Sequence, residues 1–418
     1  MTDSEKKQLV IIGGGILGLA CAYYLQRSGR VQVTLLEAGE FAAATTSQAA
    51  ALLTRARSDR NASLFVAETH RIIRHFEQLS GQPLMQRVGC WHLQDSSGLP
   101  GINPDRSGLM AYSAIAAHME LETHWRDASD IRQRFPWLNV TADAVALDYG
   151  DDGFIDPYLL ATTYLQQARA FGARCLTQQA VVALEHDGER ITAVQTDNER
   201  YRCDDVILAA GPWGKRLAQD YGVELAMATV RSHYWITDSQ PAIDRHMPML
   251  IDQRHGFYFR SENGALLFGV RDSLGCYTDA SQLPADIHSL AFPQDPQGWA
   301  ALDENWDALM ARCPLLEQAQ LSHYIAGVSS YTPDGKPLLG RAPSWKNLFI
   351  AAGCSGAGIA WSGGIGQAMA DCVLGQQGQL DIACYAPDRF HRNTPGIDVF
   401  SQQFQQQCAL ARSQKKTG

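Results

Sequence analysis

The sequence predicts an α/β fold in which a Rossmann-like nucleotide-binding domain is interleaved with an α+β domain built on an antiparallel sheet. Three observations support this prediction. A glycine-rich turn joins a strand to a helix near the N-terminus, apolar strand segments return in the middle and near the C-terminal end, and alternating strands fill the segments between them. The nucleotide-binding domain is therefore expected to be discontinuous in sequence.

The glycine-rich turn has the spacing G-x-G-x-x-G, which predicts a dinucleotide site. It follows an apolar strand at 9–12 and opens a helix with apolar residues at helical spacing. The first glycine allows a tight turn, the second lets a pyrophosphate approach the backbone, and the third lets the helix pack closely on the strand. The amides and the dipole at the helix N-terminus favour phosphate at this point. The predicted ligands of this turn are Gly13, Gly15, Ile16, Leu17 and Gly18.

A second strand, at 31–36, ends at Glu37 and Ala38, which complete the predicted nucleotide site. The Glu37 carboxylate can accept hydrogen bonds from ribose hydroxyls. Strand, helix, strand and terminal acid in this order are more specific than three glycines alone. The alternative is a glycine-rich turn in some other α/β domain.

Later segments continue the same domain. A predicted helix at 158–171 has Asp156 as its N-cap and Pro157 at its first position. A hairpin follows, with strands at 180–184 and 191–196 and its turn at Asp187 and Gly188. Two apolar runs, at 205–211 and 348–353, are typical of buried parallel strands. A helix is predicted after the second run, at 359–374.

Three pieces are expected to form the nucleotide-binding domain: residues 1–85, 146–215 and 324–385. Two excursions, 86–145 and 216–323, contain alternating strands such as 232–237 and 256–260 and are expected to build the antiparallel sheet of a substrate-binding domain. The Gln-rich residues 386–418 are expected to be a C-terminal tail.

Composition excludes several classes of protein. The chain has 418 residues, of which 45% are apolar and 19% charged, so two domains with sizeable cores are expected. A net charge of −9 argues against a nucleic-acid surface. No segment is apolar enough to span a membrane and the N-terminus lacks a signal peptide, so a cytoplasmic protein is expected. Ten cysteines form no C-x-x-C pair, which predicts neither a metal site nor a redox dithiol.

Four motifs in order resemble the D-amino-acid-oxidase-like family of FAD-dependent amine oxidoreductases, which includes glycine oxidase, sarcosine oxidase and D-amino acid dehydrogenase. The motifs are the fingerprint ending at Glu37, the segment Thr45-Thr46-Ser47-Gln48-Ala49-Ala50-Ala51, the run Ile207-Leu208-Ala209-Ala210-Gly211-Pro212-Trp213, and the block Thr332-Pro333-Asp334-Gly335-Lys336-Pro337-Leu338-Leu339-Gly340 with Gly353 to Gly358. The resemblance covers residues 8 to about 375. The similarity is weak in the segments expected to form the antiparallel sheet.

The resemblance implies FAD as the cofactor and assigns further residues to its binding. A helix starting near Ile359 would direct its N-terminus at the flavin pyrimidine edge, where its dipole and the amides of residues 357–359 could stabilise an anionic reduced flavin. An ordinary tight helix start is the alternative. Val181 and Val182 would hold the adenine, unless they are plain strand core. The other implied cofactor residues are Thr45, Thr46, Ser47, Ala210, Gly211, Trp213, Gly353, Gly356, Ala357 and Gly358.

The resemblance also predicts how the FAD is held. Members with covalent flavin carry a histidine in the segment equivalent to 46–50, where this chain has Ser47, Gln48 and Ala49, or a cysteine in the C-terminal block. We therefore expect non-covalent FAD. Cys354 is the one residue through which a covalent thioether to the flavin would still be possible.

The implied reaction is oxidation of the C–N bond of a small amino acid or secondary amine. A hydride passes from the α-carbon of the neutral amine to flavin N5, and the imine then hydrolyses. A bidentate arginine is the expected partner of the substrate carboxylate. Ser329 stands where glycine oxidase and D-amino acid dehydrogenase have that arginine. The candidates for the substrate site are therefore Ser329 itself, together with Arg55, Arg271 and Tyr258.

The electron acceptor is either oxygen or another acceptor. Leu267 stands where sarcosine oxidase has its oxygen-activating lysine, which favours a dehydrogenase or a slow oxidase, and Lys336 is expected to be a solvated turn residue. Two other interpretations stay open: an FAD-containing subunit of a hetero-oligomeric dehydrogenase of the opine or hydroxyproline type, and a flavoprotein whose FAD is structural.

Overall fold

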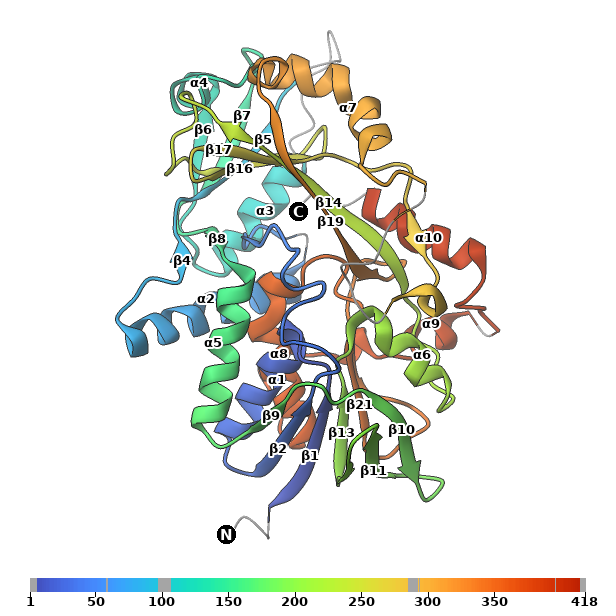
Figure 1. The fold of residues 1–418 in the computed structure, drawn as a ribbon. Coiled ribbons are helices and arrows are strands. Elements are labelled where there is room, and N and C mark those ends of the chain that lie inside the picture. Colours follow the sequence, from blue (N-terminus) through green and yellow to red (C-terminus); the bar gives the residue numbers. More distant parts are fainter. Residues whose placement is uncertain are drawn as a thin grey trace.

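A six-stranded sheet forms the lower half of the molecule in Figure 1, in the order β20-β21-β13-β1-β2-β9. The computed structural model describes residues 6–57, 59–96, 107–284, 292, 294–394 and 396–413. Five of the strands are parallel and β20 runs antiparallel at one edge. Their bounds are Lys7–Ile12 (β1), Val31–Leu36 (β2), Arg174–Leu176 (β9), Asp205–Leu208 (β13), Leu338–Arg341 (β20) and Leu348–Ala352 (β21).

Three helices pack on one face of this sheet because their inward faces are apolar. They are α1 (Ile16–Arg27), α5 (Pro157–Ala170) and α8 (Gly358–Val373), with α2 (Arg60–Ser80) outside α8. The start of α5 confirms the prediction, since the Asp156 carboxylate accepts hydrogen bonds from the amides of Tyr158 and Leu159 at 2.8 and 3.1 Å. The predicted hairpin is also confirmed as β10 (Val181–His186) and β11 (Ile191–Thr196), to which β12 (Arg200–Arg202) adds a third strand.

A nine-stranded sheet forms the upper half, in the order β18-β14-β17-β16-β15-β5-β7-β6, with β19 on the other side of β14. It is antiparallel as predicted, apart from the parallel join of β5 and β15, where the two excursions of the chain meet. The strand bounds are Cys90–Gln94 (β5), His124–Asp127 (β6), Val145–Tyr149 (β7), Ala228–Ser239 (β14), Met249–Asp252 (β15), Phe257–Glu262 (β16), Ala265–Gly269 (β17), Tyr277–Thr278 (β18) and Leu321–Tyr331 (β19).

The long strand β19 belongs to the upper sheet over its whole length, paired with β14 from Leu321 to Tyr331. The sequence placed most of it in the nucleotide-binding domain, because the T-P-D-G motif follows it directly. We therefore propose that this domain resumes after residue 331 and not at 324. The strand β7 likewise pairs with β5 and β6 in the upper sheet.

Smaller elements connect the two halves. A short sheet joins β3 (Leu52–Leu53), β8 (Gly153–Ile155) and β4 (Met85–Gln86). The remaining helices before the C-terminal segment are α3 (Ser107–His118), α4 (Ala128–Arg134), α6 (Gly214–Gln219) and α7 (Trp299–Arg312). Within the described ranges, no helix combines the length and hydropathy needed to cross a bilayer.

The expectation of a C-terminal tail is wrong for the described residues beyond 385. This segment forms α9 (Arg389–Asn393) and α10 (Gln402–Ser413), and α10 packs against β14 and β19. Its buried face joins an apolar cluster made of Ala226, Ala228, Val230, Tyr331, Val399, Phe404, Cys408 and Ala409. Glutamines occupy the positions between these apolar residues. The helical spacing of the apolar residues was therefore not recognised in the sequence.

Candidate active site

A cavity of about 770 Å³ lies between the two sheets, within the range of roughly 300–1,000 Å³ common for ligand pockets. Its walls come from the glycine turn, from the segment around Thr45, from the start of α8, and from β14, β16 and β19 of the upper sheet. The residues predicted to bind the cofactor and the residues of the upper sheet therefore line the same cavity.

The glycine turn fits a phosphate-containing ligand. Gly13 has φ +108°, and a Cβ at this position would lie 2.7 Å from the Ala209 carbonyl oxygen. Gly15 lines the cavity, and a Cβ there would meet only the Thr46 hydroxyl, at 3.4 Å. Gly18 does not line the cavity, because its Cα packs against Gly13, whose carbonyl oxygen would lie 1.9 Å from an added Cβ. Gly18 thus serves the packing of helix on strand, and its direct contact with the cofactor is not supported.

Glu37 lies at the cavity wall, at the end of β2. Its carboxylate accepts hydrogen bonds from the amides of Gly14 at 2.6 Å and Gly39 at 2.8 Å. These bonds fix the carboxylate beside the glycine turn, and each oxygen retains a lone pair for a ribose hydroxyl.

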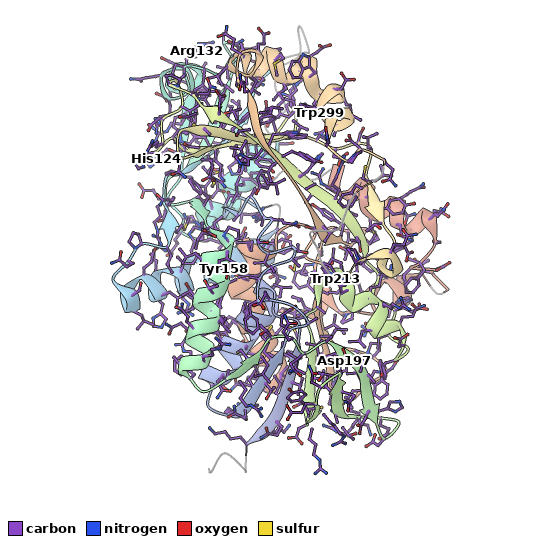
Figure 2. The ribbon with its side chains drawn as sticks, viewed as in Figure 1. His124, Arg132, Tyr158, Asp197, Trp213 and Trp299 are labelled. Atoms are coloured by element: carbon purple, nitrogen blue, oxygen red, sulfur yellow. The ribbon has the colours of Figure 1, made fainter. Side chains whose placement is uncertain are left out.

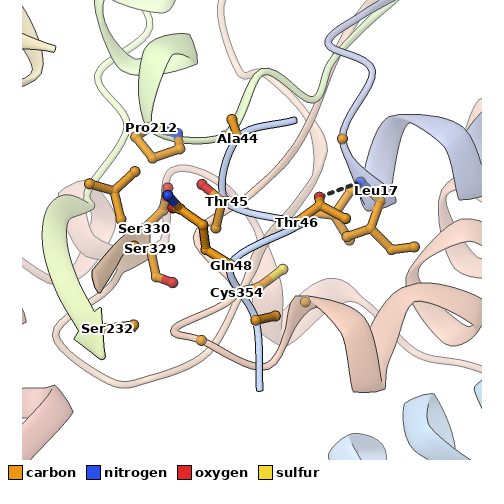
Figure 3. A pocket seen from close by; sticks show the side chains of 18 of the residues that line it. Leu17, Ala44, Thr45, Thr46, Gln48, Pro212, Ser232, Ser329, Ser330 and Cys354 are labelled. Atoms are coloured by element: carbon orange, nitrogen blue, oxygen red, sulfur yellow. Dashed lines mark hydrogen bonds between the residues drawn. The ribbon is translucent and has the colours of Figure 1, made fainter. Parts of the chain in front are cut away.

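Several polar atoms in the cavity wall have no protein partner, which is the expected condition of a site shaped for a polar ligand. They are the hydroxyls of Thr45 and Ser330 and the side-chain carbonyl oxygen of Gln48, all buried. Figure 3 shows Gln48 between Ser329 and Ser330 on one side and Cys354 on the other. The Thr46 hydroxyl accepts a hydrogen bond from the Ile16 amide at 3.0 Å. The residues present thus fit FAD in size and in polar character.

Most predicted cofactor residues line this cavity. They are Gly13, Gly15, Ile16, Leu17, Glu37, Ala38, Thr45, Thr46, Val181, Ala210, Gly211, Trp213, Gly353, Gly356, Ala357, Gly358 and Ile359. Ser47 and Val182 do not, which corrects their assignment. The Ser47 hydroxyl points back to the carbonyl oxygen of Ala43 at 2.9 Å, and the side chain of Val182 faces solvent because neighbouring residues of a strand point to opposite faces.

Trp213 lies where the two halves of the molecule meet (Figure 2). Its indole donates a hydrogen bond to the Pro284 carbonyl oxygen at 2.9 Å. This bond holds one edge of the ring while the ring lines the cavity, so Trp213 links the nucleotide-binding half to the substrate-binding excursion.

The helix α8 begins at Gly358 with its N-terminus at the cavity. No acidic residue and no side-chain cap neutralises its first turn. The Ala357 amide is already bonded to the Cys354 carbonyl oxygen at 2.9 Å, so the predicted amide set is reduced to Gly358 and Ile359. These amides and the helix dipole provide a positive potential that suits an anionic ring edge.

Three of the four predicted substrate-binding residues line the cavity: Tyr258, Arg271 and Ser329. Burial raises the pKa of the Tyr258 phenol, which therefore stays neutral at physiological pH. Arg271 has a buried Nε without a hydrogen-bond partner. The Tyr258 hydroxyl and the Arg271 Nε–H group are therefore available to donate hydrogen bonds to a ligand.

Arg55 does not line the cavity, and we do not retain it as a substrate ligand. Its Nε donates to the Asp152 carboxylate at 2.7 Å, and its Nη1 lies 3.3 Å from Asp151. The Arg55 side chain is thus occupied by two carboxylates in the protein interior. This pairing could not be predicted from local sequence patterns, because Asp152 is 97 residues away in the chain.

His233 and Arg412 line the cavity although neither was predicted as a site residue from the sequence. His233 is buried on β14, with Nδ1 3.0 Å from the Tyr324 hydroxyl. Burial and the charges of Arg412 and Arg231 hold the pKa of His233 well below its usual value, so the imidazole is neutral. The alternation of β14 predicted a strand without showing which face meets the cavity. Arg412 lay in the segment expected to be a tail.

Comparisons with known proteins agree with this site. The family model "DAO: FAD dependent oxidoreductase" matches residues 8–372. Mitochondrial dimethylglycine dehydrogenase of Rattus norvegicus is 27% identical over 399 residues, which cover 93% of this chain and 45% of that protein. The formaldehyde-forming 4-methylaminobutanoate oxidase of Paenarthrobacter nicotinovorans is 27% identical over 396 residues, 92% of this chain and 46% of that protein. The chain therefore spans a little under half the length of these curated relatives.

The fold is also that of a solved structure. The crystal structure of L-proline dehydrogenase from P. horikoshii aligns with a TM-score of 0.79 at 21% identity, covering 93% of this chain and 99% of that chain. At this identity the likeness speaks for the fold alone. The family match over most of the chain confirms the resemblance seen in the motifs and confirms FAD as the cofactor of the family: this chain belongs to the DAO family of FAD dependent oxidoreductases.

Proposed function

We propose that this chain oxidises the C–N bond of a small N-methylated amino acid with FAD as the hydride acceptor. One observation carries the proposal: a continuous cavity is lined both by the cofactor residues around Gly15 and Gly358 and by Tyr258 and Arg271 from the upper sheet. Dimethylglycine dehydrogenase and 4-methylaminobutanoate oxidase, by their names, act on N-methylated amino carboxylates, which supports this substrate class.

The residues of this chain would mainly bind and orient the substrate. Bound FAD supplies a hydride acceptor, and the protein then needs to hold the α-carbon of the amine near it. Arginine donors suit the carboxylate, and the neutral phenol of Tyr258 and imidazole of His233 offer polar contacts without further charge. Release of the imine to water completes the reaction by hydrolysis.

The same cavity supports a dehydrogenase or a slow oxidase as the reaction type. Among the described residues that line it, none is a lysine, and Leu267 is fully buried in β17 and does not face it. Lys336 is exposed in the turn after β19 and does not line the cavity. A lysine ammonium close to bound flavin would favour transfer of an electron to oxygen, and no lysine of the described wall provides one.

The test is anaerobic mixing of the purified flavoprotein with sarcosine, N,N-dimethylglycine, 4-methylaminobutanoate, and the D- and L-forms of alanine and proline. We expect an N-methylated amino acid to bleach the visible absorbance of the flavin more rapidly than alanine does. Admission of air and then of a quinone identifies the acceptor. Bleaching that neither reverses would favour the alternative of a subunit that passes electrons to a partner. A flavin that no amine bleaches would contradict the proposal and favour structural FAD.

A further inference from the structure

The C-terminal helix brings an arginine into the cavity. The buried face of α10 carries Phe404, Cys408 and Ala409, which pack against the upper sheet. Arg412 lies one helical turn beyond Cys408 and so on the same face. Its side chain is 11% exposed and lines the cavity together with residues of β14 and β16.

The guanidinium of Arg412 keeps its hydrogen-bond donors available. Its Nη1 lies 3.9 Å from the Asp272 carboxylate, beyond hydrogen-bond distance. The same carboxylate oxygen already accepts hydrogen bonds from Arg231, at 3.2 Å from Nε and 3.0 Å from Nη2. Asp272 therefore attracts Arg412 by charge without saturating its donors, and no other described carboxylate pairs with it.

Arg412 has the weakest partner among the charged groups around Asp272. Arg231 pairs with Asp272 at 3.0 Å and with Asp295 at 3.1 Å, whereas the Arg412 guanidinium lies 3.9 Å from Asp272. The Nε2 atom of His233 lies 3.4 Å from the same Asp272 oxygen. A largely buried guanidinium gains from a closer counter-charge, which a carboxylate in the cavity would supply.

Arg412 also lies close to the two neutral polar groups of the cavity. Burial raises the pKa of Tyr258, and the charge of Arg412 opposes this effect. Burial lowers the pKa of His233, and the charge of Arg412 adds to this effect. The Arg412 guanidinium therefore acts on both the phenol and the imidazole, which line the same cavity.

We propose that Arg412 binds the carboxylate of the substrate, so that the C-terminal helix completes the substrate site. This inference rests on the proposed function. It also explains why β19 can carry Ser329 in place of a carboxylate-binding arginine, because Arg412 from α10 binds the carboxylate instead. The planar fork of an arginine matches a carboxylate with two parallel hydrogen bonds, which a lysine cannot reproduce.

The experiment compares Arg412→Gln, Arg412→Lys and the control Gln406→Ala, an exposed position of the same helix, all as holoproteins. The measured quantities are the flavin content, the dissociation constant of methoxyacetate from its shift of the flavin spectrum, and anaerobic bleaching by sarcosine and by its neutral amide, sarcosinamide. Methoxyacetate is an unreactive isostere of sarcosine, so its binding is measured without turnover.

We expect Arg412→Gln to raise the apparent dissociation constants of methoxyacetate and sarcosine on the order of 30-fold, the loss of a charge-assisted hydrogen bond. The bleaching rate at saturation, the flavin content and the response to sarcosinamide should stay close to those of the wild type. Arg412→Lys should recover only part of the loss, and Gln406→Ala should match the wild type.

Carboxylate binding by Arg412→Gln within about twofold of the wild type would overturn this inference alone. Equal losses for sarcosine and sarcosinamide would also overturn it, because they would indicate a distorted cavity. A wild-type protein that no N-methylated amino acid bleaches would overturn the proposed function instead, whatever the binding of methoxyacetate shows.

Discussion

The hydroxyl of Thr46 accepts a hydrogen bond from the amide of Ile16 at 3.0 Å, although 30 residues separate them in the chain. This bond ties the segment after Glu37 to the first turn of α1, where the helix has no side-chain cap of its own. Thr46 thus satisfies a free amide at the point where a pyrophosphate is expected, and its hydroxyl proton remains available to a phosphate oxygen.

Replacement of Thr46 by valine should weaken FAD binding while keeping the shape of the side chain. The Ile16 amide would lose its partner, and a phosphate would lose a donor. We expect a loss of about 1 kcal/mol, or roughly fivefold in the FAD dissociation constant. Titration of the apoprotein with FAD, followed by fluorescence, measures it. Thr46→Ser, which keeps the hydroxyl, is the matched control. Equal affinities for Thr46→Val and the wild type would show that the bond has no part in holding FAD.

Gly13→Ala should prevent formation of the holoprotein. An added Cβ would lie 2.7 Å from the Ala209 carbonyl oxygen and the Ala210 Cα, which are backbone atoms, and φ is +108°. Relief would require separation of β1 from β13, so we expect a destabilisation of more than about 3 kcal/mol. Gly108→Ala is the control, because it has open space at the start of α3. A Gly13→Ala protein with normal flavin content and melting temperature would contradict this prediction.

The local signals of the nucleotide-binding half could be read directly from the sequence. The turn at Gly13, the cap at Asp156 and the glycines before α8 each depend on a few adjacent residues, and each lies where it was predicted. Contacts between distant segments could not be read. Arg55 pairs with Asp152, and Arg412 lines the cavity. Both placements depend on how strands and helices from different parts of the chain pack together.

The mode of FAD attachment stays a prediction, and Cys354 is the residue that decides it. Cys354 lines the cavity at the loop before α8, so it borders the space proposed for FAD. No histidine is present in residues 46–50. We expect acid precipitation to release all of the flavin into the supernatant. Yellow colour that stays in the pellet of the wild type, and is lost in Cys354→Ala, would show covalent attachment at this residue.

His92 should make the protein less stable in mild acid. This fully buried imidazole lies 3.0 Å from the Thr54 hydroxyl and 2.9 Å from the Gln253 amide nitrogen, and burial together with the charge of Arg57 lowers its pKa to about 3. The unfolded chain therefore binds one more proton than the folded protein between about pH 6.5 and pH 3. Since the unfolded state gains this proton as the pH falls, the free energy of unfolding decreases through the same window.

From pH 7 to pH 5, His92 should contribute a loss of about 2 kcal/mol in the free energy of unfolding. The substitution His92→Gln removes the titrating group and should reduce the loss seen in the wild type by this amount, even though the variant is less stable at pH 7. Urea unfolding of the holoproteins at both pH values measures the difference. Ile72→Val, which only shortens a buried side chain, should lower the stability equally at both pH values. If the curves of His92→Gln and the wild type run parallel, the folded protein accommodates a charged His92, and the neutral imidazole inferred from its burial is wrong.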